Sequence, residues 1–142
     1  TPRSSYAFSN LAMLYGQKQQ FDKMIETYGT VEKLAYGEVQ ADVDNYWAYA
    51  DLITARLAQG KIQQTYDVLD TAINVAPEDS PYTLQSLVDT LERLGDTMGP
   101  DKQIEIAPVL VQIRRKQHER YGEPEQTDNE QADDDAPTNE ES

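Results

Sequence analysis

The sequence lacks cysteine and contains a single histidine, so it has no cysteine nucleophile and almost no cysteine or histidine metal ligands. Without cysteine the chain can form no disulfide and no thiolate metal site. His118 lies in a basic segment, where a solvated surface role is favoured over a catalytic one. The sequence also has no glycine-rich phosphate loop, no short hydrolase motif and no calcium loop. An enzyme is therefore disfavoured, and we expect no catalytic, cofactor-binding or metal-binding residues.

Long apolar runs and an excess of basic residues are also missing. No run reaches the roughly 18 apolar residues that a membrane span requires. Asp and Glu number 26 against 12 Lys and Arg, which gives a net charge of −14. Nucleic-acid binding depends on neutralisation of phosphates by basic side chains. We therefore expect no nucleic-acid partner and no membrane span within this chain, and the composition indicates no compartment.

Much of the negative charge is concentrated at the C-terminal end. Residues 123–142 contain nine acidic residues, no Lys or Arg, and no aromatic or aliphatic side chain larger than alanine. Such a segment cannot bury enough apolar area to offset the entropy lost on ordering. We predict a disordered acidic tail at 123–142 and an ordered domain at 1–122.

Residues 1–122 show apolar side chains at the 3.6-residue period of amphipathic helices, which predicts an all-α fold. Gly60 and Gly95 are expected to end the third and fifth helices, and Pro100 to begin the sixth. Pro108 predicts a kink or a break in the sixth helix, and the polar segment 36–45 is expected to separate the second and third. The six apolar stripes span Phe8–Tyr15, Phe21–Leu34, Tyr49–Leu57, Ile62–Ile73, Leu84–Leu94 and Ile104–Ile113.

These stripes resemble the tetratricopeptide repeat, a helix–turn–helix unit of about 34 residues. The resemblance implies a right-handed α–α superhelix of about three helix pairs, with units at about 5–36, 46–77 and 80–121. The chain departs from the pattern at several points. Corresponding positions of the first two units are 41 residues apart, and the third unit has a longer turn. The matching residues are Phe8, Leu11, Ala12, Tyr15, Phe21, Met24, Tyr28 and Val31, then Tyr49, Leu52, Ile53, Arg56, Gly60, Ile62, Thr65, Leu69, Ala72 and Pro77, then Leu84, Leu87, Val88, Leu91 and Gly95.

In this family the first helix of each unit lines a concave groove, which implies a partner-binding site here. Tyr and Trp suit peptide recognition because they offer a large apolar area with few rotamers. The basic residues of a carboxylate clamp are missing from the corresponding positions, so acidic peptides are poor candidates. Alternatively, the aromatic residues pack on the preceding helix. The predicted groove residues are Tyr6, Met13, Trp47, Ala50, Thr54, Tyr82, Gln85 and Asp89.

We therefore expect a protein-interaction or scaffold module that binds a protein or peptide partner, without a cofactor. In the repeat frame Pro2 falls on the closing proline of a preceding unit, which predicts upstream repeats of the same parent protein. A second interpretation is the architectural end of a repeat array in a membrane-attached or periplasmic assembly protein. In its favour, the segment "NYWAYADLITARLAQGK" resembles a helix pair of periplasmic cytochrome c maturation proteins.

The basic cluster Arg114, Arg115, Lys116, His118 and Arg120 has two interpretations. Cations near the end of a helix stabilise it through the helix dipole, which is the simpler one. The cluster could instead attract the acidic tail that follows it, or an acidic partner segment.

Overall fold

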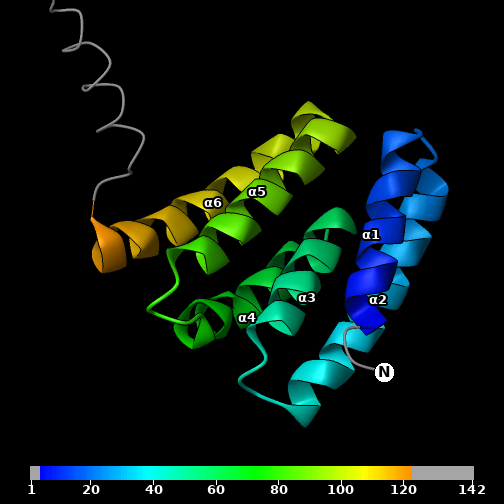
Figure 1. Ribbon diagram of the computed structural model, residues 1–142. Coiled ribbons are helices and arrows are strands. Elements are labelled where there is room, and N and C mark those ends of the chain that lie inside the picture. Colours follow the sequence, from blue (N-terminus) through cyan, green and yellow to red (C-terminus); the bar gives the residue numbers. More distant parts are fainter. Residues whose placement is uncertain (1–3, 123–142) are drawn as a thin grey trace, which may run out of the picture.

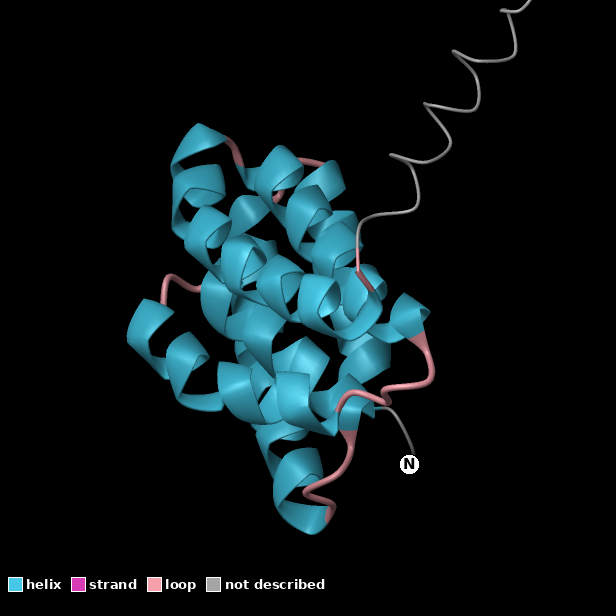
Figure 2. Ribbon diagram, turned by 90° about the vertical axis from the view of Figure 1, so that its left-hand side faces the viewer, coloured by secondary structure: helices cyan, strands magenta, loops and turns pink. Residues whose placement is uncertain are grey.

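The computed structural model describes residues 4–122, and all the secondary structure in this range is helical (Figures 1 and 2). This confirms the predicted all-α class. The predicted acidic tail and the position of Pro2 lie outside the described residues. The six helices are α1 (Ser4–Gln17), α2 (Phe21–Ala41), α3 (Tyr46–Ala58), α4 (Ile62–Val75), α5 (Pro81–Met98) and α6 (Pro100–Tyr121).

Contacts join α1 with α2, α2 with α3, α3 with α4, and α5 with α6 (Figure 1). The turn between α1 and α2 and the turn between α3 and α4 share one geometry. Gln19 and Gly60, which are 41 residues apart, have φ angles of 62° and 81°. The same backbone hydrogen bond closes both turns, at 2.9 Å from Gln20 N to Tyr15 O and at 2.8 Å from Lys61 N to Arg56 O.

Helix α3 is the centre of the molecule, because it contacts each of the other five helices. Ten of its residues are buried, from Tyr46 at its start to Ala58 at its end. A helix that is apolar on nearly all sides must be surrounded by protein. The backbone N–H of Ala48 donates to the Asn45 side chain at 3.2 Å, which caps the start of α3. Lys102 of α6 reaches the other end of the helix, where its Nζ donates to the carbonyl of Leu57 at 2.6 Å.

Helices α1 and α5 also contact each other, although three helices separate them in the chain. Thr97 Oγ1 lies 3.6 Å from the sulfur of Met13. Gly16 permits this approach, since a Cβ atom there would lie 2.8 Å from Thr97 Cγ2 and 2.6 Å from Met24 Sδ. The role of this glycine is therefore close packing, and α1 continues past it to Gln17.

The predicted helix boundaries are wrong at two places, the end of α2 and the end of α5. Helix α2 continues to Ala41, through most of the segment 36–45 that was expected to separate two helices, and it buries Val39. Helix α5 passes through Gly95 to Met98, so the turn before α6 is Gly99 alone and not a longer one. Gly95 is buried where α6 approaches most closely, since a Cβ atom there would lie 2.9 Å from Gln103 Cγ. The predicted end of α3 at Gly60 is confirmed.

Pro108 does not break α6, which runs without interruption from Pro100 to Tyr121. A proline leaves the carbonyl four residues earlier without its helical donor. That carbonyl belongs to Ile104, a residue on the exposed side of the helix. Water can therefore solvate the carbonyl, and the helix tolerates the proline.

Candidate partner-binding site

Three of the eight predicted groove residues lie in the core. Met13, Ala50 and Thr54 are buried. They are covered because α1 and α5 both pack on α3 and also contact each other. This corrects their expected place in an open groove, because buried side chains offer a partner little surface.

The other predicted residues remain accessible. Tyr6, Tyr82, Gln85 and Asp89 are exposed, and Trp47 is half-buried. The three aromatic residues lie near the N-terminal ends of α1, α3 and α5. Their binding of a partner stays a prediction.

Neighbouring contacts hold this end of the molecule together. The hydroxyl of Tyr46 donates to the carbonyl of Thr83 at 2.8 Å, which joins the starts of α3 and α5. Trp47 packs edge-on against the Tyr46 ring, with centroids 5.2 Å apart. The amide of Gln85 donates to Asp89 at 2.8 Å and accepts from Gln117 at 3.0 Å. Gln85 and Asp89 are therefore already engaged within the protein.

Helix α1 presents an exposed apolar face, although Phe8 and Leu11 belong to one of the apolar stripes of the sequence. Phe8, Leu11 and Leu14 have exposed fractions between 36% and 46%, and Phe21 at the start of α2 is similarly exposed. Positions three and four apart lie on one side of a helix. The buried side of α1 is formed by smaller residues, Ser5, Ala12, Met13 and Gly16. We refer to Phe8, Leu11, Leu14 and Phe21 as the α1 face.

The α1 face is unusual in charge as well as in exposure. Helix α1 contains no Asp, Glu, Lys or Arg, in a chain whose net charge is −14. Each of the other five helices contains charged residues. The α1 face is therefore the best candidate on the described surface for contact with an apolar partner.

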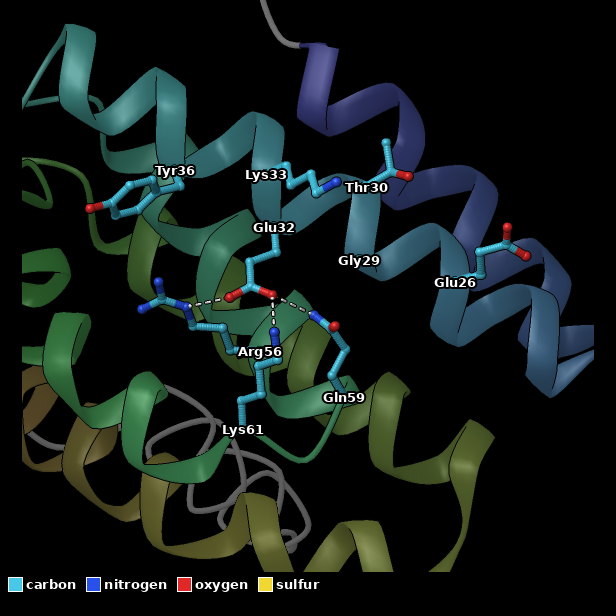
Figure 3. Close-up of a pocket in the computed structure, with 9 residues that line it drawn as sticks. All are labelled: Glu26, Gly29, Thr30, Glu32, Lys33, Tyr36, Arg56, Gln59 and Lys61. Carbon is cyan, nitrogen blue, oxygen red and sulfur yellow. Dashed lines mark hydrogen bonds and ion pairs between the residues drawn. The ribbon is translucent and has the colours of Figure 1, made fainter.

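A second candidate is a polar cleft of about 650 Å³ between α2 and the α3–α4 turn (Figure 3). Glu32 points into its centre and accepts three hydrogen bonds, from Arg56 Nε at 3.1 Å, Gln59 Nε2 at 2.9 Å and Lys61 Nζ at 2.8 Å. The full lining is Glu26, Gly29, Thr30, Glu32, Lys33, Tyr36, Arg56, Gln59 and Lys61.

The hydrogen bonds of this cleft fasten helices together and leave little free binding capacity. Burial favours the neutral form of Glu32, but the donors from Lys61, Gln59 and Arg56 outweigh it and hold its pKa below the usual value. Arg56 also donates to the carbonyl of Gln64 at 2.8 Å. The Glu32 carboxylate already pairs with Arg56 and Lys61, which leaves Lys33 as the other cation of the lining.

The basic residues of α6 serve similar packing roles. Arg120 donates to the carbonyls of Ile73 and Ala76 at 2.9 and 3.0 Å, and so caps the end of α4. Arg114 pairs with Glu92 at 2.5 Å. These contacts favour the structural interpretation of the cluster, and its predicted attraction to the acidic tail involves residues outside the described range.

Comparison with known proteins adds no relative. No family model, no curated protein and no solved structure matches the chain. Within residues 4–122, no helix is both long enough and apolar enough to cross a membrane. The same range contains no cluster of three or more His, Cys, Asp or Glu side chains suited to a metal ion.

Proposed function

We propose that this chain is a protein–protein interaction module of tetratricopeptide-like helix pairs, and that the α1 face binds a partner helix. The observation that carries the proposal is an uncharged helix with Phe8, Leu11 and Leu14 exposed. Charged residues are depleted at the centres of interfaces, and apolar ones are retained there. The right-handed superhelix implied by the resemblance is part of this proposal, and the turn repeated at Gln19 and Gly60 supports it.

The size of the α1 face sets the strength of such a complex. Covering its four side chains would remove roughly 300 Å² of apolar surface, given the area that an aromatic side chain offers. That burial contributes about 7 kcal/mol before the entropy of association, which is of similar size, is subtracted. The face alone therefore supports a weak complex, and a stable one needs further contacts with the same partner.

Site-specific crosslinking tests the proposal with the full chain. A photo-crosslinking phenylalanine analogue is placed at Leu11, or at the exposed Asp67 of α4 as a control, in an extract of the cells that make the protein. We expect a defined crosslinked protein from position 11 only, and we expect Leu14→Lys to abolish it. Equal products from both positions, or none from position 11, would contradict the proposal.

The exposed aromatic residues support a second candidate function, recognition of a peptide near Tyr6, Trp47 and Tyr82. Tyr82 is one of the most exposed large apolar side chains of the described chain, and Tyr6 is also exposed. A peptide array probed with the wild-type protein and with Tyr82→Ala and Trp47→Ala tests this candidate. Identical binding by all three proteins would eliminate it without affecting the α1 face.

A further inference from the structure

The first two helix pairs repeat each other closely enough to be compared residue by residue. Corresponding positions of their turns are 41 residues apart. The left-handed residues of the two turns are Gln19 and Gly60, and the helices that follow begin at Phe21 and Ile62. Helix α1 therefore corresponds to α3, with Leu11 in the place of Leu52.

Corresponding positions of α1 and α3 differ sharply in burial. The residues of the α1 face that lie in α1 are 36–46% exposed, whereas their counterparts in α3 are 7% exposed or less. Ala7 is likewise exposed and its counterpart buried. The corresponding pairs are Ala7 with Ala48, Phe8 with Tyr49, Leu11 with Leu52, and Leu14 with Ala55.

Helix α2 covers this side of α3. Arg56 of α3 and Gln59, the residue that follows α3, both donate hydrogen bonds to Glu32 of α2, so α2 lies against the side of α3 that carries Arg56. Leu52 and Tyr49 precede Arg56 by four and seven residues, and they continue the same side along the helix. The exposed side of α1 therefore corresponds to the side of α3 that is buried against α2.

The geometry points to one occupant for the α1 face, namely the second helix of another helix pair, packed on α1 as α2 is packed on α3. This inference rests on the proposed function and names its partner. The occupant has apolar residues opposite Phe8, Leu11 and Leu14. Acidic residues are disfavoured on its contact side, because the counterparts of Arg56, Gln59 and Lys61 are Tyr15, Lys18 and Gln20, which include only one cation.

A second copy of this chain is the competing occupant. Its α2 is already covered by its own α3, but α6 exposes an apolar stripe that includes Ile104 and Val111. A copy could therefore place α6 on the α1 face of its neighbour. Helix α6 carries charged residues along its length, unlike the uncharged α1, so this contact is the less favourable one.

A tandem duplication tests the inference with a probe made from the chain itself. A second copy of residues 4–44 is inserted directly before Ser4 of the full chain. The added copy of α2 then precedes the original α1 at the same repeat spacing at which α2 precedes α3. Because the chain has no cysteine, Leu11→Cys in the original α1 gives a single thiol reporter. Gln63→Cys, at an exposed position of α4, is the matched control.

We expect the labelling rate of the thiol at position 11 to fall at least tenfold in the duplicated chain, and that at position 63 to stay unchanged. An unchanged rate at position 11, with circular dichroism showing that the added pair is helical, would overturn the inference. The original chain, without the duplication, could instead dimerise as its concentration rises. If Leu11→Lys abolished that dimerisation, the α1 face would be assigned to a second copy. If position 11 crosslinks to a partner but its thiol is labelled at the same rate in the duplicated chain, the proposed function is supported and only this inference is contradicted.

Discussion

Gln19 and Gly60 hold the same left-handed backbone conformation at the same point of two successive turns, with φ angles of 62° and 81°. A residue with a Cβ atom loses about 1–2 kcal/mol in this conformation, and glycine does not. We expect Gln19→Gly to raise the free energy of unfolding by about 0.5–1 kcal/mol, because glycine is also more flexible in the unfolded chain. Gly60→Ala should lower it by about 1 kcal/mol. Urea unfolding measures both, and a less stable Gln19→Gly variant would contradict the assignment.

Glu32 should make a pH-dependent contribution to stability through its bonds to Arg56, Gln59 and Lys61. Glu32→Gln is expected to lower the free energy of unfolding by about 1–2 kcal/mol at pH 7, a value reduced by the partial exposure of Lys61. Because the folded pKa lies below the ordinary value of 4.5, this contribution is complete above that pH and is lost as the pH falls through the folded pKa. Urea midpoints of wild type and variant should therefore converge in acid, and a constant difference down to pH 3 would argue against this role.

Two buried tyrosines provide a matched pair. The hydroxyl of Tyr28 makes no hydrogen bond within the described chain, whereas that of Tyr46 donates to Thr83 O at 2.8 Å. Burial raises the pKa of both hydroxyls, and for Tyr28 the nearby charge of Asp51 adds to the rise, whereas Arg93 and Ser9 oppose it.

Replacement of each tyrosine by phenylalanine should therefore have different results. Tyr46→Phe removes the hydrogen bond that the Tyr46 hydroxyl donates to the carbonyl of Thr83 and should lower the free energy of unfolding by about 1 kcal/mol. Tyr28→Phe removes an unpaired buried hydroxyl and should be neutral or stabilising by up to about 1 kcal/mol. Equilibrium unfolding of both variants provides the comparison. Equal losses would mean that the Tyr28 hydroxyl is satisfied after all.

The different burial of α1 and α3 predicts unequal effects at Leu11 and Leu52. Leu52→Ala creates a cavity in the core and should lower the free energy of unfolding by about 2–5 kcal/mol. Leu11→Ala removes a side chain that is already 36% exposed, and we expect a loss of about 1 kcal/mol or less. Both are measured by denaturant titration at low protein concentration. A loss at Leu11 as large as that at Leu52 would show that the α1 face is covered in solution.

Much of the fold was predictable from the sequence, because apolar periodicity depends on local spacing. The six helices and the turn at Gly60 follow from that periodicity and from the conformational preference of glycine. The prediction that the fifth helix ends at Gly95 was wrong because a glycine is found both at helix ends and at close contacts between helices. Only the position of α6 distinguishes the two cases.

The binding surface was less predictable for a related reason. Phe8 and Leu11 follow the periodicity of core residues, and the sequence does not tell whether a neighbouring helix covers them. Met13 and Thr54 were assigned to a groove that the contact between α1 and α5 closes. Such contacts between elements distant in sequence leave no periodic signal.

The contact through Gly16 has a consequence for how the molecule unfolds. In an ideal linear array each repeat contacts only its neighbours, so the ends can unravel while the middle persists. Here α1 touches α5 through Met13 and Thr97, and the other five helices all contact α3. Loss of either end exposes the centre, so we expect residues 4–122 to unfold as one cooperative unit.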